Sequence, residues 1–287
     1  GAGTLGLLIP PSIIMIVYGV TANVSIAQLF IAGVFPGLLL ASLFMAYTIV
    51  WSLLHPDQIP PADQNMTFLQ KLDASRNLIP VISLITAVLG SIYTGLATAT
   101  EAAGLGVVGA MVIATIQGEM SWKNFRDSLL GATRLYCMIA LILAGAAFLT
   151  LAMGYIGLPR HLAEWIGSLG LSPLALVMAL MAFFIILGCF LDGISIIVLT
   201  MGILLPTIEK AGIDLIWFGI YVVLVVEMAQ ITPPVGFNLF VLQGMTKKEI
   251  TWLAKHSMPM FFLMVGAVLL IYFFPGIITW LPQHMAG

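Results

Sequence analysis

The sequence predicts an all-α polytopic membrane protein with inverted repeats, proline-broken helices and a re-entrant hairpin. Of its 287 residues, 61% are hydrophobic and only 8% are charged, a balance that is foreign to water-soluble domains. Apolar runs near the roughly 20 residues that a bilayer requires follow one another along the chain. Two runs contain a double proline, Pro10-Pro11 and Pro233-Pro234. A helix must unwind there, because proline lacks a backbone donor and clashes with the preceding turn.

The composition also excludes several classes of function. A net charge of -2 excludes a basic surface for nucleic acid. There is no Gly-Lys pair, hence no phosphate loop of an ATP-driven motor, and no His-Glu-x-x-His motif. Intramembrane aspartyl catalysis needs two carboxylates in one site, and only one aspartate lies within a span. The cysteines, Cys137 and Cys189, lie in apolar stretches and indicate no disulfide framework. We therefore expect neither an enzyme nor an organic cofactor.

The first part of the chain, residues 1–54, is interpreted as the end of a first repeat. It holds a broken span at 1–19 and a continuous span at 29–54. Residues 55–77, which carry most of the prolines and aspartates outside the spans, are predicted to form a cytoplasmic connector. Because Gly1 stands inside an apolar run without a start methionine, we expect further sequence upstream.

Residues 78–282 are interpreted as a second, inverted repeat. Its expected elements are spans at 78–97, 99–117 and 132–156, a re-entrant hairpin at 173–208, a broken helix at 214–243, an amphipathic interfacial helix at 246–258 and a last span at 259–282. A shift of 223 positions superposes Pro10 on Pro233, Pro11 on Pro234 and Pro36 on Pro259. Matched broken helices in two repeats are typical of the binding site of a secondary transporter. The alternative is a pair of ordinary proline kinks.

The basic residues orient these spans. If 78–117 and 173–208 each leave and return to one side, most of the basic side chains fall on a single side. That side holds Lys71, Arg76, Lys123, Arg126, Arg134, Lys247, Lys248 and Lys255, and the other holds Arg160 and Lys210. The positive-inside rule makes the first side cytoplasmic. The two broken helices then cross the membrane in opposite directions, as alternating access requires.

Three carboxylates lie within apolar spans: Glu101, Asp192 and Glu227. An ionisable residue inside a membrane is a functional hypothesis by default. Asp192, in a Leu-Asp-Gly-Ile-Ser stretch, marks a turn and a helix start at the tip of the hairpin. Glu101 has the spacing of a helix start and is interpreted as structural. Glu227, about a turn before the second break, either tunes a cation site or has a structural role.

Hard oxygen ligands at the hairpin tip and at the two breaks suit a cation such as Na⁺, and a half-helix N-terminus suits an anionic substrate. The predicted sodium ligands are Gly188, Asp192, Ala229, Thr232 and Val235, with Gly6, Ile9 and Ser12 at equivalent positions of the first break. The predicted substrate contacts are Ser12, Gly193, Ser195, Gly236 and Asn238.

Four motifs together resemble a known family over essentially the whole chain. They are GTLGLLIPPSI at 3–13, ATEAA at 99–103, LDGISII at 191–197 and ITPPVGFNLF at 231–240. They resemble the large membrane subunit of TRAP transporters, the tripartite ATP-independent periplasmic systems. The resemblance implies an elevator-type, Na⁺-coupled importer of organic acid anions in the inner membrane of bacteria or archaea. It also implies a small membrane subunit and a periplasmic substrate-binding protein as partners.

The resemblance places the second Na⁺ site on the 188–192 hairpin tip and the 229–236 break. It places the first on residues 6–12 together with a hairpin that this chain lacks. Ala99 replaces a family proline. The alternative within transporters is a stand-alone divalent-anion/Na⁺ symporter without a binding protein; the other open class is a purely structural or enzymatic membrane subunit. C4-dicarboxylates, sialic acid and other sugar or keto acids all remain open as substrates.

Overall fold

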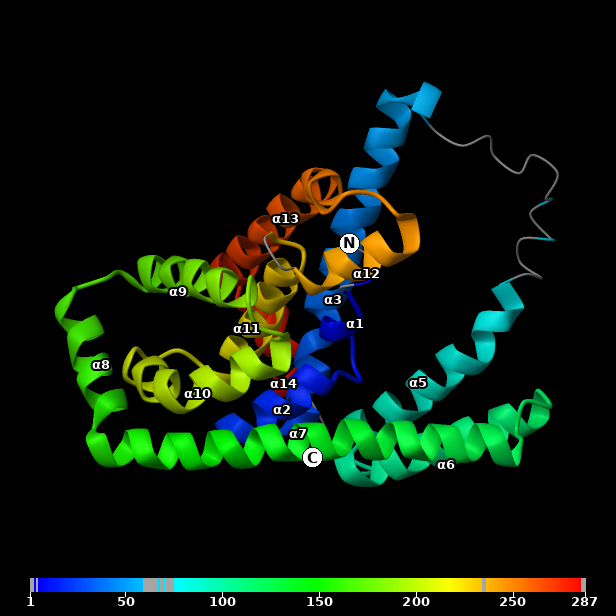
Figure 1. Cartoon of the computed structure of the whole chain (residues 1–287), viewed down its shortest axis with the longest axis horizontal. Helices are drawn as coiled ribbons and strands as arrows, with labels where there is room; N and C mark the ends of the chain where they lie inside the picture. Colours follow the sequence, from blue (N-terminus) through cyan, green and yellow to red (C-terminus); the bar gives the residue numbers. More distant parts are fainter. Residues whose placement is uncertain are drawn as a thin grey trace. The chain divides into compact units, whose positions relative to one another are not determined.

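The computed structural model describes residues 5–58, 75–233 and 236–284, together with Gly3, Thr67 and Gln70. Within these residues all regular structure is helical (Figure 1), which confirms the all-α prediction. Five of the described helices are long and apolar enough to cross a membrane, as a polytopic protein requires. They are α3 (Ile26–Leu54), α6 (Ala99–Ile116), α7 (Trp122–Ile156), α10 (Gly193–Lys210) and α13 (Ile250–Phe273).

The chain divides into two compact units. Unit 1 comprises residues 1–41 and 132–284, and unit 2 comprises residues 42–131 and 285–287. Unit 2 contains the end of α3, the short 3₁₀ helices η1 (Pro56–Gln58) and η2 (Arg76–Leu78), the helices α5 (Ile79–Tyr93) and α6, and the start of α7. Helices α5 and α6 pack side by side, and Gly109 leaves room on α6 for the Leu84 side chain.

Unit 1 contains every described residue of the predicted transport site. It holds parts of α3 and α7 and the whole of α10 and α13. Its other helices are α1 (Leu5–Leu8), α2 (Ile13–Ala22), α8 (Leu158–Ser168), α9 (Pro173–Gly188), α11 (Leu215–Gln230), α12 (Phe237–Thr246) and α14 (Gly276–Gln283).

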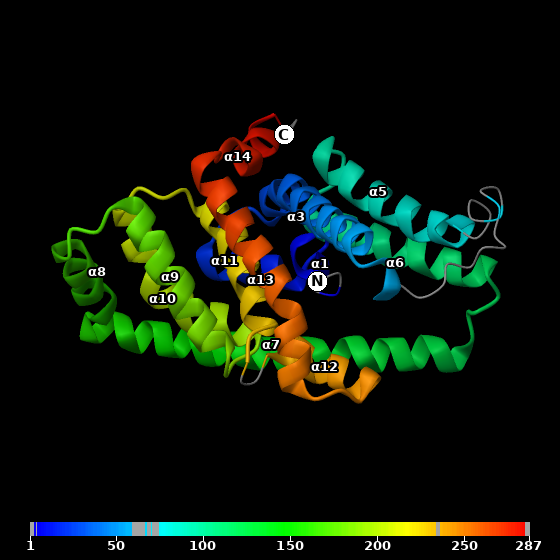
Figure 2. The ribbon, with the colours of Figure 1, turned by 90° about the horizontal axis from the view of Figure 1, so that it is seen from above.

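Helix α11 is the core of unit 1. Every residue from Trp217 to Gln230 is buried, as expected for a helix that is hydrophobic on all sides and packed on all sides. Figure 2 shows α13 lying across it, and the Trp217 indole donates to the Ile271 carbonyl of α13 at 3.0 Å. Two tyrosine hydroxyls fix the other faces. Tyr221 donates to Val177 O of α9 at 2.6 Å, and Tyr18 of α2 donates to Leu215 O at 2.7 Å.

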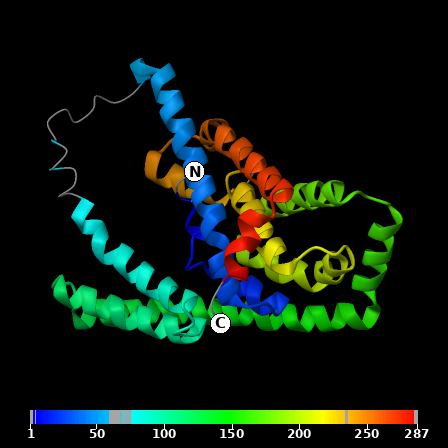
Figure 3. The same ribbon diagram turned by 180° about the vertical axis from the view of Figure 1, so that it is seen from behind.

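Residues 173–208 form a helical hairpin. Helix α9 ends at Gly188, and α10 begins at Gly193 and runs back in the opposite direction, the two helices lying apart away from the tip (Figures 1 and 3). Helix α10 also packs on α2, which brings the first part of the chain against the hairpin. The tip of the hairpin is thus anchored from both sides within unit 1.

Both proline pairs coincide with breaks between helices. Helix α1 ends at Leu8 and α2 starts at Ile13, while α11 ends at Gln230 and α12 starts at Phe237. Of the second pair, Pro233 is described and Pro234 lies outside the described residues. The third matched pair, Pro36 and Pro259, lies inside the long helices α3 and α13.

The structure runs residues 250–273 as one helix, α13. The expected boundary between an interfacial helix at 246–258 and a last span at 259–282 therefore falls inside a continuous helix. Pro259 is tolerated there, since neighbouring groups in a helical membrane bundle can satisfy the freed carbonyls. The chain turns instead at Lys247, in a left-handed conformation, and again at Phe274 after α13. The division into repeats and the membrane orientation stay predictions.

Candidate functional site

Asp192 caps helix α10 at the hairpin tip. Its Oδ2 accepts hydrogen bonds from the backbone N–H groups of Ile194 (3.1 Å) and Ser195 (3.3 Å). Its Oδ1 accepts one from the Ser195 hydroxyl. Asp192 is exposed, and about one acceptor position of its carboxylate is left over. Asp192 therefore caps α10 in the structure. If it also binds sodium, the same carboxylate must serve as cap and ligand at once.

The hairpin tip is pressed against the end of α11. A Cβ placed on Gly188 would overlap the Cβ of Ala229, so only glycine permits this approach. The Cys189 thiol donates to the carbonyl of Pro233 at 3.2 Å. The structure thus brings together Gly188 and Ala229, two of the predicted sodium ligands, along with the first proline of the second break.

Gly193, the first residue of α10, lies where three helices meet. A Cβ there would come within 2.7 Å of both Ile14 on α2 and Val226 on α11, and within 3.2 Å of the Gln230 amide nitrogen. Gln230 is a buried polar side chain that the sequence analysis missed. Its signal was available: it is an amide side chain inside an apolar span, three residues before Pro233.

The second break gathers backbone carbonyls. The Thr232 hydroxyl donates to Met228 O at 2.7 Å, and Gly236 N–H donates to Thr232 O at 3.1 Å. A Cβ on Gly236 would lie 2.8 Å from both Gln230 O and Thr232 O, so glycine is required where the two carbonyls converge. Asn238 is half-buried in the first turn of α12. Val235 lies outside the described residues.

The first break is tighter at one end and open at the other. Ser12 is buried, its hydroxyl donates to Leu7 O, and it accepts from Met15 N–H at 3.4 Å, which caps α2. Gly33 on α3 lets the chain approach, since a Cβ there would lie 2.8 Å from Leu8 O. Gly6 is exposed with open space beside it, and Ile9 is 38% exposed. The accessible side of this break is therefore formed by Gly6 and Ile9.

Glu101 is a helix cap in unit 2. Thr98 and Glu101 form a reciprocal capping box at the start of α6. The Glu101 carboxylate accepts from both the backbone N–H and the hydroxyl of Thr98 at 2.8 Å. These hydrogen bonds explain why a carboxylate stands here, and no bound ligand is needed. This agrees with the structural interpretation of Glu101.

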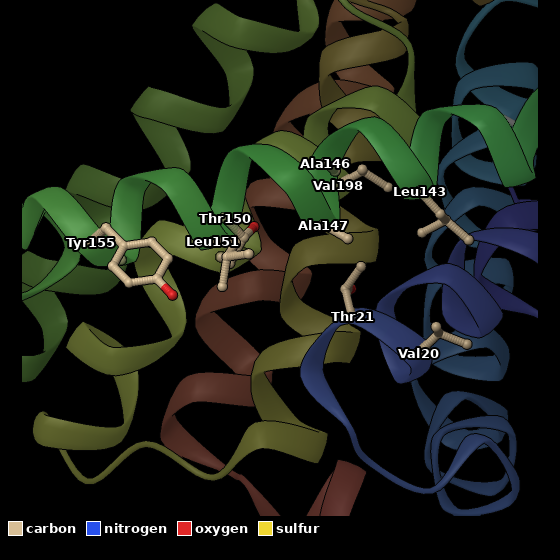
Figure 4. Close-up of a pocket in the computed structure, with 11 residues that line it drawn as sticks. Val20, Thr21, Leu143, Ala146, Ala147, Thr150, Leu151, Tyr155 and Val198 are labelled. Atoms are coloured by element: carbon tan, nitrogen blue, oxygen red, sulfur yellow. The ribbon is translucent and has the colours of Figure 1, made fainter.

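A cavity in unit 1 lies away from these residues. It has a volume of about 730 Å³ and lies between α2, α7 and α10 (Figure 4). Its walls are mainly apolar, with Thr21 and Thr150 as polar exceptions near its middle and Tyr155 at one end. None of the predicted site residues lines it. Its size therefore says nothing about the transport site.

Two broken helices, a hairpin tip seated on one of them and a surface suited to a bilayer together define a membrane transport protein. Comparison with known families specifies which kind. The model of the tripartite ATP-independent periplasmic transporter, DctM component, matches residues 1–277. The chain belongs to this family, and it is a multi-pass protein of the inner membrane.

Several curated relatives are similar over almost the whole chain. The C4-dicarboxylate TRAP transporter large permease protein of Pseudomonas aeruginosa is 32% identical over 99% of this chain and 66% of its own length. The isethionate TRAP transporter permease protein of Oleidesulfovibrio alaskensis is 33% identical over 100% and 44%. The sialic acid TRAP transporter permease protein of Haemophilus influenzae is 30% identical over 97% and 45%. The chain thus spans about two thirds or less of these relatives.

Proposed function

We propose that this chain is part of the large transmembrane subunit of a Na⁺-coupled importer of organic acid anions, which a periplasmic protein delivers. A small membrane subunit completes the assembly. The family membership supports the transporter class, and the relatives' names supply the substrate class: C4-dicarboxylate, isethionate and sialic acid are all organic acid anions.

The proposal rests mainly on the contact between the hairpin tip and the second break. Proline at 233 and 234 deprives the carbonyls of Ala229 and Gln230 of their helical i+4 donors. Ala229 O accepts from Thr232 N–H at 3.1 Å instead. Gln230 O then converges with Thr232 O beside Gly236. Carbonyl oxygens concentrated in this way, together with the carboxylate of Asp192 at the hairpin tip, are suitable ligands for Na⁺.

The anionic group of the substrate fits best at the start of α12. Ser12 caps α2 and Asp192 caps α10 through their side chains, whereas no described side chain caps α12 at Gly236. The positive end of the α12 dipole is therefore suited to an anionic group, although the N–H of Leu239 in its first turn already donates to Gly236 O at 2.8 Å. Asn238 in that turn adds an amide donor.

The test is uptake of radiolabelled C4-dicarboxylate or sialic acid by the full-length subunit with its partners in sodium-free proteoliposomes. We expect uptake when an inward Na⁺ gradient is imposed and the purified binding protein is present, and none from internal ATP alone. Uptake that needs Na⁺ but not the binding protein would favour the stand-alone symporter. Uptake driven by ATP without Na⁺ would contradict the proposal.

A further inference from the structure

Gln230 is a mostly buried amide at the meeting point of the hairpin tip and the second break. It is the last residue of α11, and its exposed fraction is 8%. Its backbone carbonyl lies beside Gly236 at the start of α12, 2.8 Å from where a Cβ would stand. Its side-chain nitrogen lies beside Gly193 at the start of α10, 3.2 Å from the corresponding position. One residue thus reaches from the start of α12 to the start of α10.

The amide of Gln230 has no hydrogen-bond partner among the residues that the structure describes. Other polar side chains at this junction are already hydrogen-bonded within the protein. The Ser195 hydroxyl donates to the Asp192 carboxylate, and the Thr232 hydroxyl donates to Met228 O at 2.7 Å. A mostly buried amide that lacks any such bond requires an explanation.

The Gln230 amide is also accessible to a molecule that enters the junction. Among the described residues, the side-chain nitrogen and oxygen atoms that are both fully enclosed and unpartnered belong to Thr207 and Glu227. The Gln230 amide is unpartnered but is not one of these enclosed groups. A ligand can therefore reach it between the hairpin tip and the break.

The chemistry of an amide indicates which ligand group fits. Its nitrogen is a double donor and its oxygen is an acceptor. A hydroxyl group can accept from the nitrogen and donate to the oxygen, so it satisfies both. A carboxylate can only accept, and it would leave the amide oxygen facing a negative charge. A hydroxyl group is therefore the best match for this side chain.

The charges around Gln230 also disfavour a second acid group at this point. Asp192 directly precedes Gly193, and its carboxylate repels another anion nearby. In the described helices α2, α10, α11 and α12 the one basic side chain is Lys210, which lies in the last turn of α10, at the other end from the hairpin tip. The described walls of the junction thus favour an uncharged polar group.

We propose that Gln230 determines substrate specificity by hydrogen-bonding a hydroxyl group that lies close to the acid group of the transported anion. The inference rests on the proposed function, in which the acid group binds at the start of α12. Because Gln230 joins the start of α12 to the start of α10, the hydroxyl group reaches its amide from there. The preferred substrates are hydroxy acids, which include sugar acids and hydroxysulfonates, over the same anions without the hydroxyl group.

The test measures Na⁺-driven uptake by the full-length assembly in proteoliposomes for pairs of anions that differ by one hydroxyl group. The pairs are malate and succinate, isethionate and ethanesulfonate, and sialic acid and its 2-deoxy derivative. Each variant is compared with wild type on the same anion and with the same binding protein, so that differences in delivery cancel.

Three variants are needed. Gln230→Met keeps nearly the same size and removes both donors and the acceptor. Gln230→Asn keeps the amide but withdraws it by one methylene. Gln28→Met, at an exposed position in the first turn of α3, is the matched control.

We expect Gln230→Met to raise the half-saturating concentration of the hydroxylated anion about tenfold, since a hydrogen bond to a mostly buried group is lost. The anion without the hydroxyl group should be nearly unaffected, so that the preference for the hydroxylated member collapses. The unfolding temperature and the Na⁺ dependence should stay at wild-type values. Gln230→Asn should fall between wild type and Gln230→Met, which keeps the test informative if Gln230→Met does not fold. Gln28→Met should match wild type.

Two kinds of result overturn the inference, and they are distinguishable. If the Gln230 variants lower uptake of both members of a pair equally, or of neither, Gln230 does not read the hydroxyl group, and Na⁺-coupled import still stands. If the wild-type assembly shows no Na⁺-driven uptake of any of these anions, the proposed function fails along with the inference.

Discussion

At the scale of single residues, the three intramembrane carboxylates differ in whether free backbone N–H groups lie nearby to bind them. Asp192 and Glu101 begin helices, where free N–H groups are within reach of a short side chain. Glu227 lies in the interior of α11, where every backbone N–H is already used by the helix. Sequence spacing was sufficient to identify the first two as helix starts. It was not sufficient for Glu227, because burial by α1 depends on contacts across more than 200 residues.

Asp192 provides a residue-scale prediction that separates its two roles. Asp192→Ala removes both the cap and the charge, whereas Asp192→Ser removes the charge and keeps an oxygen that can cap. We expect the alanine variant to lose about 1 kcal/mol of stability and the serine variant much less. Both should require more Na⁺ for uptake. Thermal unfolding and the Na⁺ dependence of uptake are the two measurements; a serine variant with wild-type Na⁺ dependence would leave Asp192 as a cap only.

At the scale of elements, the site depends on the approach of the hairpin tip to the end of α11. Gly188 and Gly193 are both required by that contact, since a Cβ on either meets an atom of α11. The hairpin itself was predictable from two apolar runs around an Asp-Gly pair. Which helix its tip touches was not, because no local pattern encodes a contact between residues 188 and 229.

Gly188→Ala tests this contact. The added methyl group must displace Ala229, and overpacking of this kind costs about 1–3 kcal/mol. We expect lower thermal stability and a larger loss of uptake, because the carbonyls of the second break move away from the tip. Gly266→Ala on α13, where a Cβ meets nothing within 4 Å, is the control and should be neutral or slightly stabilising. Equal behaviour of the two variants would contradict the assigned contact.

At the scale of the whole molecule, the shift of 223 positions relates more than prolines. It carries α2 onto α12 and the start of α3 onto the start of α13, each within one residue of the observed bounds. The sequence predicted this correspondence because backbone chemistry at proline is local. It misplaced the boundary near residue 258, since composition there changes from polar to apolar while the helix continues. The opposite orientation of the two halves was inferred from the lysines and arginines and stays a prediction.

The central claim is that the second break exists for binding and not merely as a kink. The most direct measurement is Na⁺-driven uptake, together with thermal stability, for a Pro233→Ala/Pro234→Ala double variant of the full-length assembly. Alanine restores the donors to Ala229 O and Gln230 O, and each helix-interior proline costs about 3 kcal/mol. We therefore predict a protein that is at least as stable as wild type and does not transport. Near-normal uptake by a variant with a continuous helix would contradict the claim. The binding site could then no longer be assigned to the second break.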